Sequence, residues 1–215
     1  DTSREEEVNV PEKMSLGPII LPTEPMIGEV IGLSITQSFG ALQRFEVVAT
    51  EGNGRLIPLG SMMRVMKESL KAAYECMSHN KTLGIDPDFK KDYDITVLAT
   101  QMGIPKEGPS AGITILTAMV SALAKKPVRN DIAMTGEITL LGKILPVGGV
   151  QEKLIAAAEA GIKKVYVPAG NEKDIEMLPD EIRNKLEIKF VSKVEEVLND
   201  AIIGYQTTTT STVTS

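Results

Sequence analysis

The apolar residues between positions 26 and 203 change their spacing repeatedly, and this change of period limits the fold more than any other feature. Segment 93–101 alternates apolar and polar residues, as a strand does. Segments 61–79 and 150–161 instead have the apolar spacing of helices. Strands and helices mixed in this order give an α/β or α+β class, and we expect a single mixed-sheet domain. The 215 residues are enough for one such domain.

The sequence also places the individual elements. Residues 28–36 and 42–50 are expected to pair as strands around the turn Ser-Phe-Gly-Ala. Ser61 is expected to open the helix that ends near residue 79. The further elements that we expect are a strand at 93–101, a helix from Ser110 to Lys126, two short strands within 132–149, a helix at 150–161, a strand at 163–168, a short helix near 171–178, a strand at 187–191 and a helix at 193–202.

Both ends of the chain lack apolar periodicity. Residues 1–25 are charged and then rich in proline, so we expect a linker from a preceding domain. Residues 204–215 end in the low-complexity stretch QTTTTSTVTS and are expected to form a flexible tail. The chain begins with Asp1 rather than Met and shows no signal peptide, which indicates a piece of a longer protein. The folded domain is accordingly expected at 26–203.

Charge and composition exclude several classes of function. The net charge of −6 and the pI of about 5.0 argue against a broad surface for nucleic acid or anionic membranes. The chain has no Trp, four Phe and four Tyr, so aromatic platforms for stacking bases are not expected. The longest apolar runs, such as 113–124, are too short to span a bilayer.

A single cysteine and a single histidine restrict the chemistry further. Cys76 cannot form an internal disulfide and fits a reducing compartment. One Cys and one His cannot supply three ligands of a Cys/His zinc cluster, so we expect no metal site. A histidine base would have to be His79, which lies at the polar end of a helical segment. We favour a solvated helix cap for it over a catalytic role.

Two glycine-containing segments imitate nucleotide sites. The segment GEITLLGKI (136–144) resembles a P-loop, but it has one residue too many between the glycines and carries Ile144 where the magnesium-binding hydroxyl belongs. Gly148 and Gly149 precede a helix, which alone is a weak indication of an anion site. We therefore expect no nucleotide site in this chain.

The segment KEGPSAG (106–112) presents a serine directly before an apolar, helix-forming run. Unpaired N–H groups at a helix N-terminus can stabilise the oxyanion that forms when a hydroxyl attacks a peptide carbonyl. Gly108 and Gly112 leave room for a substrate to approach. A serine before an apolar helix is also a routine N-cap. On this segment alone, the nucleophile and N-cap interpretations of Ser110 stand equal.

A serine nucleophile needs a base, and Lys153 is the best candidate among the lysines. The residues three and four positions from it on its helix are small or apolar, namely Gly149, Val150, Ala156 and Ala157. Burial among such neighbours would lower the pKa of the amine and allow it to accept the serine proton. The spacing alone nevertheless favours a boundary lysine that extends its amine to water.

Two blocks of the sequence together resemble the proteolytic domain of Lon proteases. They are KEGPSAG and MTGEITLLGKILPVGGVQEKLIAAAEAGIKKVYVP, and the lysine of the second block lies 43 residues after the serine of the first. The resemblance covers residues 26–203 and includes the segments LGIDPDF, LPDEI and VEEVL. Two matched blocks are far more specific than one Gly-x-Ser-x-Gly-like match.

The resemblance implies a Ser–Lys dyad with Ser110 as the nucleophile and Lys153 as the general base. We expect their side chains to lie within or near hydrogen-bond reach. Thr135 matches the family threonine whose hydroxyl bonds the lysine, and Glu107 matches an acidic position that lies near this lysine in some members. Ile35 stands where many bacterial members carry an aromatic residue, which leaves the preference of the substrate pocket open.

Lon proteases are ATP-dependent, so the resemblance implies a serine endopeptidase domain that degrades unfolded or damaged polypeptides without a metal or organic cofactor of its own. ATP and magnesium would serve an ATPase module outside this chain, in a hexameric and cytoplasmic protein whose membrane anchoring is left open. The alternative is a non-catalytic Lon-like assembly module of a larger ATPase, in which the dyad is lost. The presence of Ser110, Lys153 and Thr135 favours the peptidase.

Overall fold

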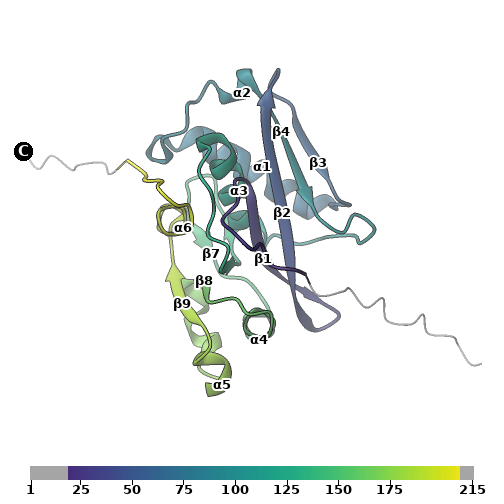
Figure 1. Ribbon diagram of the computed structural model, residues 1–215, viewed down its shortest axis with the longest axis vertical. Coiled ribbons are helices and arrows are strands. Elements are labelled where there is room, and N and C mark those ends of the chain that lie inside the picture. Colours follow the sequence, from purple (N-terminus) through teal and green to yellow (C-terminus); the bar gives the residue numbers. More distant parts are fainter. Residues whose placement is uncertain (1–18, 209–215) are drawn as a thin grey trace, which may run out of the picture.

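The computed structural model describes residues 19–208, which fold around a seven-stranded sheet (Figure 1). The strands lie in the order β3-β4-β2-β1-β5-β8-β9. Their bounds are β1 Glu29–Thr36, β2 Phe39–Glu51, β3 Leu56–Leu59, β4 Tyr93–Ala99, β5 Ile132–Met134, β8 Lys164–Pro168 and β9 Glu187–Val191. The expected class, a single α/β domain with a mixed sheet, is confirmed.

The strand directions decide where a site can form. β1 runs parallel to β5, β5 to β8, and β8 to β9, whereas β2 runs antiparallel to β1 and to β4. β3 is parallel to β4, so within residues 19–208 β2 is the one strand of this sheet that opposes the others. Parallel strands share the edge at which they end, and α/β proteins commonly bind ligands there. The residues that end β1 and follow β5 meet at this edge.

Helices cover both faces of the sheet. α1 (Arg64–His79), α3 (Gly112–Ala124) and α6 (Val194–Ala201) pack into one core, and α4 (Val150–Glu159) packs into a second core on the opposite face. β1 serves both, because alternate side chains of a strand point to opposite faces: Val30 joins the first core and Ile31 the second. Among residues 19–208, the helices are too short or too polar to cross a membrane.

α3 is the most buried helix. Eleven of its thirteen residues are buried, which is why its sequence is apolar on all sides rather than on one stripe. It lies between the sheet and the other helices of its layer (Figure 1). The start of α3 is therefore fixed by packing along its whole length.

The remaining elements are short. They are the two-stranded ribbon of β6 (Glu137–Ile138) and β7 (Ile144–Leu145), the helices α2 (Phe89–Asp92) and α5 (Asp180–Arg183), and the 3₁₀ helices η1 (Lys81–Leu83) and η2 (Ala169–Ile175). Several elements differ from expectation. The segment 132–149 forms three short strands rather than two, and η2 replaces the expected helix at 171–178. The strand β3, the helices α2 and α5 and the 3₁₀ helix η1 were not anticipated.

The turn between β1 and β2 is shorter than expected. The pairing of Thr36 with Phe39 leaves Gln37 and Ser38 as a two-residue turn, so β2 begins within the expected turn Ser-Phe-Gly-Ala. Both turn residues have positive φ, 48° and 69°. A two-residue turn with both residues in this region matches the twist of antiparallel strands. Gln37 and Ser38 adopt it although neither residue is glycine.

The helix α1 begins at Arg64, not at Ser61. Ser61 has φ 58° and its carbonyl accepts the N–H of Lys106, so it belongs to a loop contact rather than a cap. The first turn of α1 is capped from elsewhere, because the N–H of Met66 donates to Glu107 Oε1 at 3.0 Å. Short-range sequence rules do not reveal a cap that comes from 41 residues away.

The packed domain extends beyond residue 203, the end expected from the sequence. Tyr205 is buried in the first core and its hydroxyl donates to the carbonyl of Leu83. The N–H of Thr208 donates to the carbonyl of Thr82 at 2.8 Å. Most of the expected linker and the rest of the expected tail lie outside the described residues.

Candidate active site

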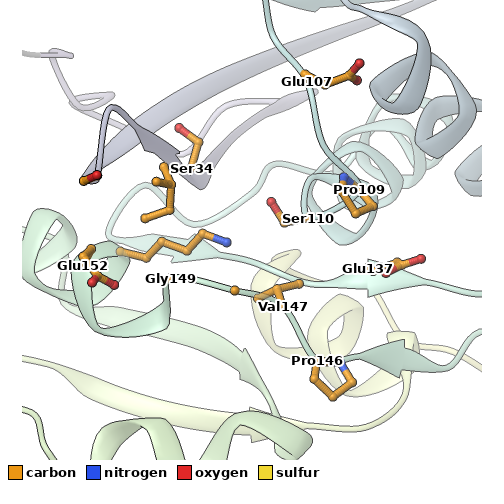
Figure 2. Close-up of a pocket in the computed structure, with 13 residues that line it drawn as sticks. Ser34, Glu107, Pro109, Ser110, Glu137, Pro146, Val147, Gly149 and Glu152 are labelled. Atoms are coloured by element: carbon orange, nitrogen blue, oxygen red, sulfur yellow. The ribbon is translucent and has the colours of Figure 1, made fainter.

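The end of β1, the loop that leads into α3, the β6–β7 ribbon and the beginning of α4 meet around a cavity of about 700 Å³ (Figure 2). Both candidate catalytic residues, Ser110 and Lys153, line it. The other lining residues are Ser34, Ile35, Ser38, Glu107, Pro109, Glu137, Pro146, Val147, Gly148, Gly149 and Glu152. The site thus lies at the edge where the parallel strands end.

Ser110 is not the N-cap of α3. The N-cap is Ala111, and no side chain caps this helix end. Within residues 19–208 the Ser110 hydroxyl has no hydrogen-bond partner, and Figure 2 shows it directed into the cavity. The carbonyl of Ser110 accepts the N–H of Gly136 at 2.9 Å. The backbone is therefore anchored while the hydroxyl is left for a reaction.

The first turn of α3 keeps two backbone donors. The N–H groups of Gly112 and Ile113 donate to the carbonyls of Pro109 and Gly136. Those of Ser110 and Ala111 have no acceptor in the described part of the chain. Unpaired N–H groups and the positive end of a helix dipole stabilise negative charge. An oxyanion formed on a carbonyl at Ser110 would lie next to these donors.

Lys153 is buried, with 3% of its surface exposed, so the boundary interpretation that its spacing favoured is wrong. Its amine donates to Thr135 Oγ1 at 3.0 Å. Burial lowers the pKa of Lys153 to about 8. Among residues 19–208 no carboxylate pairs with it, and an ammonium has three protons to donate where one partner is present. The surroundings therefore make the neutral amine accessible at a lower pH than for an ordinary lysine.

The segment after β5 links the two candidate residues. Thr135 is 1% exposed, and its N–H donates to the carbonyl of Tyr166. The hydroxyl of Thr135 accepts a hydrogen bond from the amine of Lys153. The N–H of the next residue, Gly136, donates to the carbonyl of Ser110. No direct hydrogen bond joins Ser110 to Lys153 within the described chain, although both side chains line the same cavity.

Glu107 faces another way. Its carboxylate accepts the N–H groups of Met66 and Gly108, at 3.0 and 3.1 Å. In Figure 2 it points away from Ser110, and it forms no ion pair with Lys153. In this structure Glu107 fixes the loop that carries Ser110 to the start of α1.

His79 lies outside the cavity. It ends α1, is exposed, and its ring pairs with Glu75 at 3.1 Å rather than with the last carbonyls of the helix. Within residues 19–208, no group of three or more His, Cys, Asp and Glu side chains is arranged to hold a metal ion. The segment 136–144 forms the β6–β7 ribbon, which lacks the strand–loop–helix form of a P-loop.

The comparison with protein families agrees with this geometry. A family model described as the Lon protease (S16) C-terminal proteolytic domain matches residues 18–204. This chain belongs to the Lon protease family. The match begins and ends next to the limits of the described structure, so the Lon proteolytic domain comprises the whole of the sheet and its helices.

Similar proteins of known identity are also named Lon proteases. Lon protease 1 of Thermus thermophilus is 48% identical over 176 residues, which are 81% of this chain and 22% of that protein. The Lon protease of Nitratidesulfovibrio vulgaris is 49% identical over 179 residues (83% and 22%) and that of Escherichia coli is 46% identical over 180 residues (83% and 23%). The chain thus spans between a fifth and a quarter of the length of the relatives that it matches.

Sequence reasoning related Ile35 to the substrate pocket of the Lon domain, but it overlooked the glycines that let the β1–β2 hairpin approach α4. Ile35 contacts Gly149, where an added Cβ would lie 2.4 Å from its side chain. Gly149 has φ 66°, and it precedes α4 without a side-chain cap. Gly40 lies equally close to the backbone of α4. The sequence shows that glycines stand at positions 40 and 149. It does not show which distant segment each glycine contacts in the fold.

Proposed function

We propose that this Lon proteolytic domain hydrolyses peptide bonds with a Ser–Lys dyad, in which Ser110 is the nucleophile and Lys153 the general base. The observation that carries the proposal is the buried amine of Lys153. It shares a cavity with Ser110, bonds Thr135, and has its pKa lowered to about 8 by burial. A base with a pKa near the working pH is partly neutral, so it can accept a proton and deliver it again.

The proposed reaction follows from these positions. The neutral amine of Lys153 accepts the proton of the Ser110 hydroxyl as the oxygen attacks the scissile carbonyl. The oxyanion is stabilised by the N–H groups of Ser110 and Ala111. Lys153 then donates its proton to the leaving amine, and water hydrolyses the ester by the same steps. Thr135 orients the amine throughout, and Glu107 keeps the loop of Ser110 in place.

The wider proposal concerns the intact protein. We propose that residues 1–25 link this domain to an ATPase module, that ATP and magnesium act there, and that the dyad itself needs no metal or organic cofactor. The assembled protein would be a hexameric cytoplasmic ring that degrades unfolded polypeptides. The support is the family, together with the short part of its relatives that the chain covers.

The direct test is a peptidase assay on this chain. We expect slow cleavage of a labelled, unstructured polypeptide, no cleavage of the same polypeptide within a stable folded domain, and no change on adding ATP and magnesium, because the segment 136–144 is not a P-loop. Acceleration by ATP would contradict the absence of a nucleotide site. A folded chain that cleaves nothing between pH 6 and 10 would instead support the non-catalytic assembly module.

The pH dependence of cleavage is a second expectation. The pKa of Lys153 is lowered to about 8, so the neutral base is the minor form at pH 7 and the major form at pH 9. The rate of hydrolysis should therefore rise roughly tenfold between pH 7 and pH 9 and then level off. Initial rates in buffers of constant ionic strength measure it. A rate that is flat over this range would show that another group is the base.

A further inference from the structure

The tip of the β1–β2 hairpin, residues 35–40, lies against the beginning of α4. Two glycines mark the contact, and neither has room for a side chain. A Cβ on Gly40 would lie 2.0 Å from the carbonyl oxygen of Glu152 and 2.9 Å from the backbone nitrogen of Lys153. A Cβ on Gly149 would lie 2.4 Å from Ile35. The hairpin tip therefore contacts the backbone of Lys153 and the residue four positions before it.

The loop that precedes α4 is fixed by hydrogen bonds. Asn171, buried in η2, accepts the N–H of Val147 at 2.9 Å and donates to its carbonyl at 2.8 Å. The start of α4 itself has no side-chain cap. The first turn of α4 thus contacts the hairpin tip, and the loop that leads into it is held by Asn171.

The turn at the hairpin tip is itself in an unfavourable conformation. Gln37 and Ser38 both have positive φ without being glycine. Side chains in this region are retained when the surroundings fix the backbone strongly, and such sites cluster near functional groups. Ser38 lines the cavity beside Ser34 and Ile35. The position of the tip is therefore determined by more than the preference of its own residues.

We propose that the hairpin tip sets the position of Lys153 and that Gly40 is a positioning residue for the dyad. The close approach of the Gly40 backbone keeps the first turn of α4 against the sheet, so that the lysine side chain enters the cavity at the depth at which it meets Thr135. The inference rests on the proposed function for its consequence in catalysis. The position of the amine can be measured independently of it.

Because no charged group of the described chain pairs with Lys153, the pKa of its amine reports how deeply the amine is buried. The ionisable residues of the same cavity are Glu107, Glu137 and Glu152, and none of them pairs with the lysine in the described structure. The segment after β5 contributes the hydroxyl of Thr135, β1 contributes Ser34, and the start of α3 contributes Ser110. Burial is the cause of the lowered pKa of Lys153, so a displaced amine that meets water should titrate higher.

The test is a titration of Lys153 by NMR with labelled lysine, in a Ser110→Ala background that prevents self-cleavage. The signal is assigned by its absence in Lys153→Met. We expect Gly40→Ala to raise the measured pKa of Lys153 by about one unit or more, towards the ordinary value near 10.4. Ile35→Ala removes the second contact without adding atoms, and should shift the pKa in the same direction by less.

Two glycine variants serve as controls. A Cβ on Gly52 would lie 2.3 Å from the carboxylate of Asp94, beyond the far end of β2, so Gly52→Ala introduces crowding against a side chain away from the cavity. Gly103→Ala meets nothing within 4 Å and controls for the change of residue alone. Both should leave the pKa of Lys153 unchanged. A pKa that stays the same in folded Gly40→Ala and in Ile35→Ala would overturn the proposal, as would an equal rise in Gly52→Ala.

A peptidase assay separates this inference from the proposed function. With Ser110 present, Gly40→Ala should lower kcat at pH 7 by about tenfold and move the rise of activity with pH upwards by the same amount as the NMR titration. Loss of activity without that shift would indicate a merely structural role and contradict the proposal. If the parent chain cleaves nothing, the proposed function fails, while the NMR titration still decides whether the hairpin tip positions Lys153.

Discussion

Replacing Ser110 with alanine is expected to reduce peptide hydrolysis by at least about 10⁴-fold while the domain folds as before. The Ser110 hydroxyl has no hydrogen-bond partner in the described chain and lies before a helix that it does not cap, so its removal leaves no buried group unsatisfied. Any residual activity would come from the oxyanion donors and from substrate binding. Initial rates with an unstructured peptide, and urea unfolding for stability, measure both effects.

A second serine in the same cavity provides the control. Ser34 lines the cavity, and its hydroxyl donates to the carbonyl of Ala41 at 3.4 Å, so it is already engaged. We expect Ser34→Ala to change the rate by a few-fold at most. Equal losses in the two variants would mean that Ser110 has no special role as the nucleophile.

Replacing Lys153 is expected to abolish activity and to change stability in opposite directions, depending on the residue introduced. Both Lys153→Arg and Lys153→Met should lose about 10³-fold or more in rate, because a guanidinium does not release its proton at working pH and a thioether accepts none. At pH 7, Lys153→Met should be more stable than the parent and Lys153→Arg less stable. The guanidinium of an arginine at position 153 would stay charged, and burying a charge at this site lowers the stability of the folded domain.

The sign of the stability change follows from linkage. The pKa of Lys153 is about 8 in the folded domain and near 10.4 in the unfolded chain, so the unfolded chain binds the proton more tightly. At pH 7 this disfavours folding by about 3 kcal/mol. The parent should gain that stability as the pH rises from about 8 to 10.4, and Lys153→Met should lack this part of the slope. Urea unfolding at pH 7 and at pH 10 tests the difference. A parent curve parallel to that of Lys153→Met would show that the lysine is not buried in solution.

The elements that the sequence predicted well are those whose signal is local. The alternation at 93–101 and the apolar run after Ser110 each depend on neighbouring residues, and the strand β4 and the helix α3 formed there, with ends shifted by a few residues. The short strand β3 and the 3₁₀ helix η2 lacked such a signal. β3 is stabilised by pairing with β4, which its four residues alone do not indicate.

The candidate site was harder to predict because its geometry depends on contacts between distant segments. Helical spacing favoured a boundary lysine, since a helix pattern cannot show that the β1–β2 hairpin covers Lys153. The N-cap role that Ser61 and Ser110 suggested by their positions is absent at both, because Glu107 caps α1 and packing fixes α3. The pairing of Ser110 with Lys153 came from two matched blocks rather than from either residue.

The two helices that begin at the cavity belong to opposite layers of the domain. α3 packs into the core on one face of the sheet and α4 into the core on the other, and their first turns meet only at the edge between them. The hydroxyl of Ser110 and the amine of Lys153 are therefore brought together only when the helices of both layers have packed against the sheet. If these two residues form the proposed dyad, cleavage requires both layers to be packed, and a domain with only one layer packed would be inactive.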